Sequence, residues 1–251
     1  MIQSQAGKPD MQKIKALFRK EILQNFNTPI GYTFIVLFLL IESFVFFYGF
    51  KNASFWDRNS SEMEVFFMLA PILFLVFIPS IGMRIWSDEK ETGTWELLLT
   101  LPITEWEIVL GKFLATCFSF IAALICTIFI PLTISVLGDP DWGVIFSGYV
   151  GMILLGIAFS SVVLYVSLFV KSQITSFLVG FVSLGIMYLL GIQKLVDILD
   201  TEYFGWLGIF SISKHYETFR LGIFDPRSFY FFFSLTAVFL YLSVIHLQKK
   251  R

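Results

Sequence analysis

Long apolar runs separated by short polar breaks dominate this sequence of 251 residues. A helix that crosses the hydrocarbon core of a bilayer needs roughly 20 mostly apolar residues. Six runs reach about that length, at residues 30–50, 65–85, 106–137, 146–170, 174–192 and 229–247. The pattern predicts an all-α integral membrane protein with six transmembrane helices. A hydrophobic share of 57% and 31 Phe residues agree with that fold class.

The distribution of Lys and Arg gives this arrangement a direction, because basic residues that flank a span are retained on the cytoplasmic side. If the N-terminus is cytoplasmic, 12 of the 18 basic residues fall inside, namely Lys8, Lys13, Lys15, Arg19, Lys20, Arg84, Lys90, Lys112, Lys171, Lys249, Lys250 and Arg251. We therefore expect a multi-pass protein with both termini in the cytoplasm.

Residues 1–29 precede the first apolar run and differ from it in pattern. Apolar side chains recur there every three or four residues, as in an amphipathic helix, at Met11, Ile14, Phe18, Ile22 and Phe26. Basic side chains cover the rest, and Pro29 ends the helix. The pattern predicts a cytoplasmic amphipathic connecting helix in 1–29, followed by a single six-span domain in 30–251. The helix lies either in the membrane interface or against another chain.

Two other segments depart from simple spans. Pro71 and Pro79 each remove a backbone hydrogen bond from the second run, so the helix should kink or pass its freed carbonyl groups to neighbours. Residues 193–228 form a long, semi-apolar connection on the outer side, rich in aromatic side chains. Trp and Tyr favour the membrane interface, so this connection predicts external re-entrant helices between spans five and six.

Motifs for catalysis or nucleotide binding are absent from the sequence. It contains neither H-E-x-x-H nor G-x-S-x-G, and its two histidines, His215 and His246, are far apart. Gly111-Lys112 resembles the end of a phosphate-binding loop, but Phe113 follows where Ser or Thr is needed. We expect a non-enzymatic chain without cofactor or metal, and any ATP site should lie on a partner.

Apart from Glu107 at the very start of the third run, Glu42 is the one acidic residue within a predicted span, and intramembrane carboxylates are often functional. It stands alone, with Ser43 and Tyr48 as possible hydrogen-bond partners. We interpret it as a possible intramembrane polar site, either a structural hydrogen bond or a polar contact along a translocation route.

The connection between the second and third runs, WSDEKETGTWELLLTLPITEWEIVLGK at 86–112, concentrates charge, helix breakers and leucines. The second helix should extend to Glu91 and end at Gly93. Thr94 can cap a short helix that Pro102 stops. Thr104 and Glu107 have the spacing of a capping box, which starts the third span at Trp106.

The short helix carries apolar side chains that would be costly in water, at Trp95, Leu97, Leu98, Leu99 and Leu101. Trp95, Leu98 and Leu99 should share one face. Either they dip into the headgroup region, or they dock in a groove of a cytoplasmic partner.

This connection resembles the signature of ABC-2 type transporter permeases, in which a G-T-x-E-x-L-L-x-T-P-I-like string precedes a span with a Gly-Lys pair. The segment SISKHYETFRLGIFDPRSFYFFFSLTAVFLYL at 211–242 is similar to the external segment and last span of the same family. It is most like the gliding-motility permease branch and its nitrous-oxide-reductase-maturation relatives. The resemblance covers essentially the whole chain.

The resemblance implies a half-transporter in the bacterial inner membrane that exports a substrate or transmits force. Two permeases, identical or paralogous, would pair above two cytoplasmic ATPase subunits, which bind ATP and Mg. Each ATPase would receive one coupling helix in a groove. Carried over by motif, the ATPase-coupling residues are Glu91, Gly93, Thr94, Trp95, Glu96, Leu98, Leu99 and Pro102. Trp95 departs from the aliphatic residue expected there. The alternative is an ATP-independent channel or membrane scaffold, and the sequence predicts no substrate.

Overall fold

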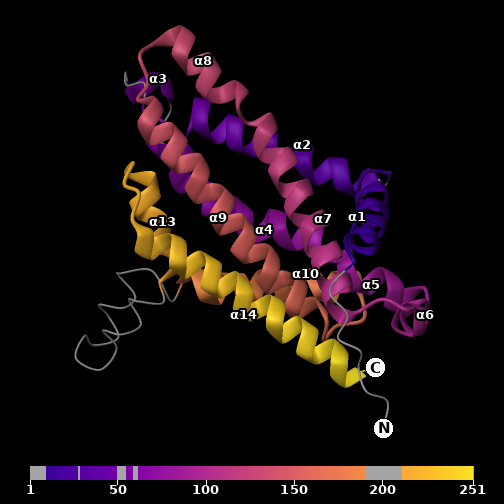
Figure 1. The fold of residues 1–251 in the computed structure, drawn as a ribbon. Coiled ribbons are helices and arrows are strands. Elements are labelled where there is room, and N and C mark those ends of the chain that lie inside the picture. Colours follow the sequence, from indigo (N-terminus) through magenta and orange to yellow (C-terminus); the bar gives the residue numbers. More distant parts are fainter. Residues whose placement is uncertain (1–9, 28, 50–54, 59–61, 190–210, 251) are drawn as a thin grey trace.

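The computed structural model describes residues 10–27, 29–49, 55–58, 62–189 and 211–250, and this part of the chain is helical without strands (Figure 1). Its helices are α1 (Met11–Phe26), α2 (Pro29–Tyr48), α3 (Phe55–Arg58), α4 (Glu64–Gly82), α5 (Arg84–Glu91), α6 (Trp95–Thr100), α7 (Glu105–Cys126), α8 (Phe129–Leu137), α9 (Trp142–Ser167), α10 (Gln173–Leu189), α13 (Ile212–Arg220) and α14 (Pro226–Lys250). The predicted all-α class is confirmed.

Five helical segments are long and apolar enough to cross a membrane, namely Gly31–Tyr48, Glu64–Glu91, Glu105–Leu137, Trp142–Ser167 and Pro226–Lys250. They coincide with five of the six predicted spans. The sixth, α10, is apolar but shorter over its described residues, and the end of the predicted run at 190–192 lies outside them. The six-span layout therefore stays a prediction.

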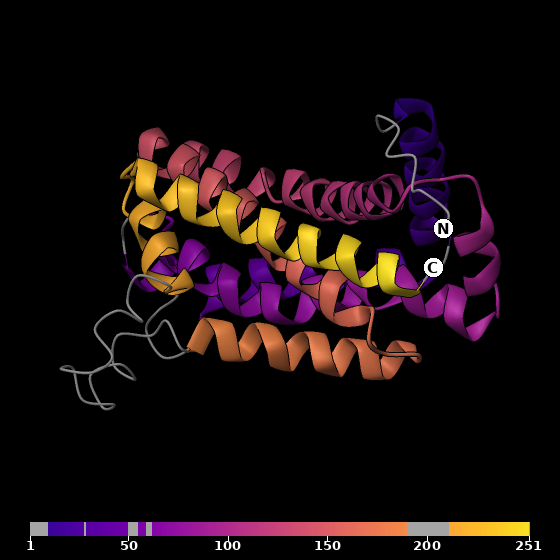
Figure 2. The ribbon, with the colours of Figure 1, turned by 60° about the horizontal axis from the view of Figure 1, so that its bottom comes forward.

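Helix α9 occupies the centre of the bundle. It is the most buried of the apolar segments, with 67% of its most hydrophobic window buried, and it packs against α4, α7, α10, α13 and α14. Figure 2 shows the long helices running side by side, whereas α1 stands across one end of them, close to α6. The C-terminal end of α14 lies at this same end of the bundle.

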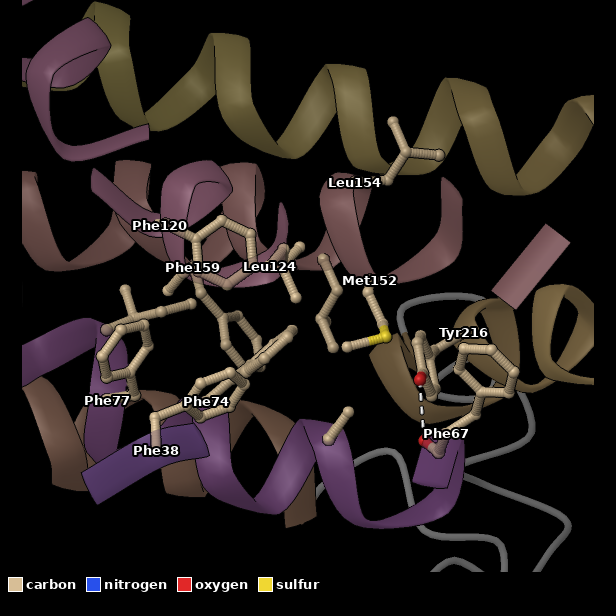
Figure 3. Packing of buried hydrophobic residues seen from close by; sticks show 14 of the residues in the cluster. Phe38, Phe67, Phe74, Phe77, Phe120, Leu124, Met152, Leu154, Phe159 and Tyr216 are labelled. Carbon is tan, nitrogen blue, oxygen red and sulfur yellow. Dashed lines mark hydrogen bonds between the residues drawn. The ribbon is translucent and has the colours of Figure 1, made fainter. Parts of the chain in front are cut away.

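Aromatic rings fill the interior between α2, α4, α7 and α9, and we call this cluster the phenylalanine core. Its buried rings belong to Phe38, Phe46, Phe66, Phe67, Phe74, Phe77, Phe120 and Phe159, and Phe219 of α13 and Phe232 of α14 extend the cluster. Figure 3 shows six of these rings, those of Phe38, Phe67, Phe74, Phe77, Phe120 and Phe159. Phe74 meets Phe120 edge to face, with 4.9 Å between ring centroids. Edge-to-face contacts suit the ring quadrupoles, so the core combines apolar burial with directional packing.

Pro71 removes a backbone hydrogen bond from α4, as predicted. A proline at this position cannot donate to the carbonyl four residues earlier, which belongs to Phe67. The Tyr216 hydroxyl of α13 donates to that Phe67 oxygen instead, over 2.7 Å (Figure 3). The freed carbonyl is thus passed to a neighbour, and the exchange fixes α13 against α4.

The third predicted run, 106–137, is not one continuous helix. A turn at Thr127 and Ile128 separates α7 from α8, and Pro131 lies in the first turn of α8. A proline is tolerated in a first turn because the amide groups there have no helical acceptor. The hydrophobic pattern gave no sign of this break, and Pro131 was the available signal for it.

The predicted external helices fall partly outside the described residues, which omit 193–210. The described part contains α13, whose Ile212, Tyr216 and Phe219 are buried against the bundle. A short amphipathic helix is therefore present after residue 210, and its re-entry into the membrane stays a prediction.

The buried face of α1 follows the predicted stripe only in part, with Ile14 buried and Phe18 and Ile22 half-buried. Ile14, Leu17 and Glu21 are buried, whereas Met11 and Phe26 at the ends of the predicted apolar stripe are exposed. The reason is the partner surface: α1 packs across α7 of its own chain. Lys15 and Arg19 remain exposed on the opposite side, so a contact with headgroups stays a prediction.

Candidate functional site

The charged connection adopts the local structure that its residues predict. Helix α5 ends at Glu91, and Gly93 follows with φ +73°, a conformation that favours glycine. Thr94 occupies the N-cap position of α6, although its hydroxyl bonds to the Thr92 hydroxyl and not to the helix. Leu101 is extended before Pro102, which ends α6.

The predicted capping box at the start of α7 is confirmed, with α7 beginning one residue early at Glu105. The Thr104 hydroxyl accepts from the Glu107 amide, and Glu107 Oε2 accepts from the Thr104 amide over 2.7 Å. The other oxygen of Glu107 accepts from the Asp10 amide over 2.6 Å. One carboxylate therefore caps α7 and holds the first residue before α1.

The two faces of α6 have different surroundings. Trp95 packs edge to face on Trp86 of α5, and Leu98, which is 7% exposed, joins a buried cluster with Trp86 and Ile108. The Nζ atoms of Lys90 and Lys250 lie 5.1 and 5.9 Å from the Trp95 ring centroid. The face that carries Trp95 and Leu98 is thus directed onto its own chain.

The opposite face of α6 is open. Leu97 is 63% exposed, Leu101 is exposed in the turn that follows, and Glu96 and Thr100 lie between them. We call Glu96, Leu97, Thr100 and Leu101 the outer face of α6. The exposed apolar side chains of this face are therefore Leu97 and Leu101, whereas Leu98 packs against this chain.

Beneath α6 lies a buried ionic cluster around Lys112. Its ammonium group donates to Glu21 Oε1 at 2.8 Å, to Glu89 Oε1 at 2.7 Å and to the Ile85 carbonyl at 2.6 Å. An ammonium has three donors, and all three are used. The Lys112 side chain is fully buried, so it joins α1, α5 and α7 out of contact with solvent.

The fourth member of the cluster is Lys20 of α1. Its Nζ lies 2.9 Å from Glu89 Oε1 and 3.3 Å from Glu21 Oε1. Burial by itself would lower the pKa of Lys20, but the two carboxylates outweigh that effect and raise the pKa above its ordinary value. Two lysines thus balance two glutamates in the cluster, with Lys112 fully buried and Lys20 half exposed at its edge.

Close packing brings α1 near enough for these bonds. If Gly111 carried a Cβ atom, that atom would lie 2.9 Å from the Leu17 Cβ, which is closer than side chains normally approach. Lys13 Nζ also donates to the Pro102 carbonyl over 2.8 Å, so α1 reaches the end of α6 as well. The Gly-Lys pair of the motif therefore has a structural meaning: Gly111 admits α1, and Lys112 binds it.

Polar contacts also tie α5 to the hairpin between α9 and α10. The side-chain Nε2 of Gln173 donates to Asp88 over 2.8 Å, and its backbone N–H donates to Glu91 over 3.0 Å. Lys90 donates to the carbonyl groups of Leu168 and Val170, both at 2.7 Å. Since the last carbonyls of α9 lack helical donors, Lys90 completes that helix end.

The structure assembles most of the predicted coupling residues at one end of the bundle. Glu91, Gly93, Thr94, Glu96 and Pro102 are exposed there, Leu99 is half-buried, and Trp95 and Leu98 point inward. Glu42 lies apart from them, in the phenylalanine core. The sequence pattern did not predict that Glu21, Glu89 and Lys112 form one cluster. A lysine seven residues inside a predicted span was the signal that such a partner set exists.

Within the described residues, no group of three His, Cys, Asp or Glu side chains could hold a metal ion. The buried carboxylates Glu21 and Glu89 face the ammonium groups of Lys20 and Lys112. The chemistry of this end is therefore ion pairing between helices.

The chain matches the model of one known protein family over nearly its whole length. The model described as ABC-2 family transporter protein matches residues 2–246, a range that contains α1 to α13 and most of α14. No curated protein matches the chain. The resemblance in the sequence is confirmed at the level of the family, and the gliding-motility branch stays a prediction.

Proposed function

Because the chain belongs to the ABC-2 family of transporter proteins, we propose that it is a permease subunit whose α6 receives the movement of a separate cytoplasmic ATPase. The family is a membrane transport component and not a catalytic enzyme. Two permeases, identical or paralogous, would stand above two ATPase subunits that bind ATP and Mg. Export of a substrate and transmission of force to an envelope machine both fit this arrangement.

The observation that carries the proposal is the contrast between the two faces of α6. The inner face packs on Trp86 and the buried cluster, whereas the side chains of Leu97 and Leu101 are exposed. A surface groove that takes up two leucines, with Glu96 at its edge, would bury apolar area and fix the register. We therefore assign partner contact to the outer face of α6, and support of the helix to Trp95 and Leu98.

A push on α6 would reach the bundle through α5 and α1. The helix is joined to α5 through Trp95 and Trp86, and α5 is joined to α1 and α7 through Glu89 and Lys112. A salt-bridged contact with all donors used resists sliding, because each displacement leaves a buried charge without its partner. The coupled unit would then move the membrane helices as the ATPase closes.

The test compares two exposed apolar side chains at the same end of the molecule. Leu97→Asp on α6 is expected to abolish copurification of an ATPase from native membranes, because a carboxylate would enter an apolar groove. Met11→Asp is the matched control, since Met11 is 76% exposed but lies on α1. Equal retention of the ATPase by both variants would contradict the assignment.

An ATP-independent channel or scaffold is the competing function. In that case no ATPase with a phosphate-binding loop would copurify with the native protein, even under mild solubilisation. The absence of such a subunit would overturn the proposal itself, whereas equal behaviour of Leu97→Asp and Met11→Asp would overturn only the docking face.

A further inference from the structure

Glu42 lies on α2 inside the phenylalanine core and is fully buried, at 0% exposure. Neither of its carboxyl oxygens has a hydrogen-bond partner among the described residues. Buried polar groups in proteins are paired in the large majority of cases, so an unpaired carboxyl group needs a physical explanation. Neither Ser43 nor Tyr48, the partners suggested by the sequence, bonds to it.

The neighbours of Glu42 on its own helix are apolar. Phe38, Glu42 and Phe46 follow each other at four-residue spacing and are the buried positions of α2 for which burial is described. Phe38 stacks on Phe77 with 4.7 Å between ring centroids, and Phe46 meets Phe66 edge to face at 6.1 Å. Glu42 is therefore enclosed between two aromatic contacts that join α2 to α4.

This register also defines what α4 presents to the carboxyl group. The two pairs place Glu42 opposite the middle of α4, around the fully buried Ala70. The stretch between Phe66 and Phe77 contains no polar side chain. Helix α4 can thus offer neither a hydrogen-bond donor from a side chain nor a countercharge.

The ionisable groups that interact with Glu42 are two tyrosines, Tyr149 of α9 and Tyr216 of α13. Both hydroxyl groups already have partners, since Tyr149 bonds to Thr127 at 3.0 Å and Tyr216 donates to the Phe67 carbonyl. Within the described residues, no side chain of α1, α3, α4 or α7 adds a charge that acts on Glu42.

An ionised carboxylate in such surroundings would carry the whole cost of lost hydration with nothing to offset it. A neutral carboxylic acid costs far less. We propose that Glu42 is an intramembrane proton-binding site, occupied by a proton as long as α2, α4 and α13 stay packed as in this structure. The ligand is the proton itself, held in an O–H bond of the Glu42 carboxyl group.

Release of the proton requires water at the site. When the packing of α2 against α4 opens, water hydrates the carboxyl group, the O–H bond breaks, and the proton passes to water as the carboxylate forms. The occupancy of Glu42 is thus tied to the arrangement of the helices. The inference concerns this chain alone and does not depend on a partner ATPase.

Infrared spectroscopy of the purified protein in lipid nanodiscs at pH 7 tests the proposal. An ordinary glutamate has a pKa of about 4.3 and is ionised at that pH, so few side chains contribute a protonated carboxyl stretch. The folded protein should show such a band, and Glu42→Gln, a neutral side chain of similar shape, should remove it. Glu42→Leu should remove the same band, which guards against a defect of one variant.

Glu89→Gln is the matched control, because Glu89 is buried but paired with Lys20 and Lys112. It should leave the band unchanged. Unfolding in a denaturing detergent at the same pH should abolish the band, since Glu42 then becomes an ordinary glutamate. Identical spectra for the native protein and Glu42→Gln at pH 7, or a band that survives unfolding, would overturn the proposal.

Discussion

Two regions of the bundle, the α6 end and the phenylalanine core, bury acidic side chains in opposite ways. At the α6 end, Glu21 and Glu89 lie within 3 Å of the Lys112 ammonium, and every donor of that lysine is used. In the phenylalanine core, Glu42 is as deeply buried and has no partner among the described residues. The paired charges suit a permanent joint between helices. The unpaired one suits a group whose charge changes with the packing.

The two regions also differ in how they hold the helices together. The ionic cluster connects three helices that are separated in sequence and leaves one face of α6 open. The phenylalanine core holds α2, α4, α7 and α9 together mainly by apolar contacts, to which the hydrogen bonds from Tyr216 of α13 to Phe67 and between Tyr149 and Thr127 are added. Under the proposed function, movement would enter the bundle at the first region, and the second would respond to it by repacking.

The largest expected effect comes from removing the countercharge of the ionic cluster. Lys112→Met leaves Glu21 and Glu89 buried with only Lys20 nearby, which should cost about 3–5 kcal/mol of stability. Thermal unfolding in detergent measures the loss. Lys249→Met, at an exposed lysine, is the control and should change little.

A rescue variant sharpens the same prediction. Lys112→Met combined with Glu21→Gln and Glu89→Gln removes the unpaired charges, so much of the lost stability should return. A triple variant that is less stable than Lys112→Met would contradict the electrostatic explanation. It would indicate that the loss of stability comes from poorer side-chain packing.

A smaller effect is expected from crowding the phenylalanine core. A Cβ on Gly148 of α9 would lie 2.5 Å from two carbon atoms of the Phe67 ring, so Gly148→Ala must displace that ring at a cost of about 1–3 kcal/mol. Gly185→Ala on α10 is the control, because its Cβ meets nothing within 4 Å. If both variants unfold at the same temperature, the close approach of α4 to α9 is wrong.

The Tyr216 hydroxyl offers a test of the same order. Tyr216→Phe leaves the Phe67 carbonyl without a donor, since Pro71 cannot supply one, and should destabilise the fold by about 1–3 kcal/mol. Tyr230→Phe, at a side chain that is 77% exposed, should be nearly neutral in the same unfolding assay. Equal stability of the two variants would show that Phe67 finds another partner.

The smallest effect concerns the start of α7. Thr104→Ala removes the hydroxyl that accepts from the Glu107 amide and should cost about 1 kcal/mol. Thr94→Ala at the start of α6 should cost less, because Thr94 makes no cap bond to its helix. Hydrogen exchange of the first turn of each helix distinguishes the two. A larger increase in exchange in α6 on Thr94→Ala than in α7 on Thr104→Ala would reverse the expectation.

The local features of the connection could be predicted because they depend on neighbouring residues. The signals for the helix ends act over a few positions, and they are Gly93, Pro102 and the pair of Thr104 and Glu107. In the structure α5, α6 and α7 end or begin within one residue of the positions that these signals indicate. Pro71 belongs to the same class, although the identity of the group that replaces its bond was not predictable.

The ionic cluster could not be predicted in the same way, because its partners are distant in the sequence. Lys112 and Glu21 are 91 residues apart, and their contact depends on α1 crossing α7. The same long-range packing decides which face of α6 is free. The equal hydrophobicity of Leu97 and Leu98 concealed that one is exposed and the other buried.

The most direct test of the account is a photo-crosslinking amino acid placed at position 97 in native membranes. We expect the reactive group on the outer face of α6 to form an adduct with an ATPase subunit, identified by mass spectrometry through its phosphate-binding loop. The same group at the exposed Leu178 of α10 should form none. An adduct with that subunit from position 178 and none from position 97 would contradict the central claim.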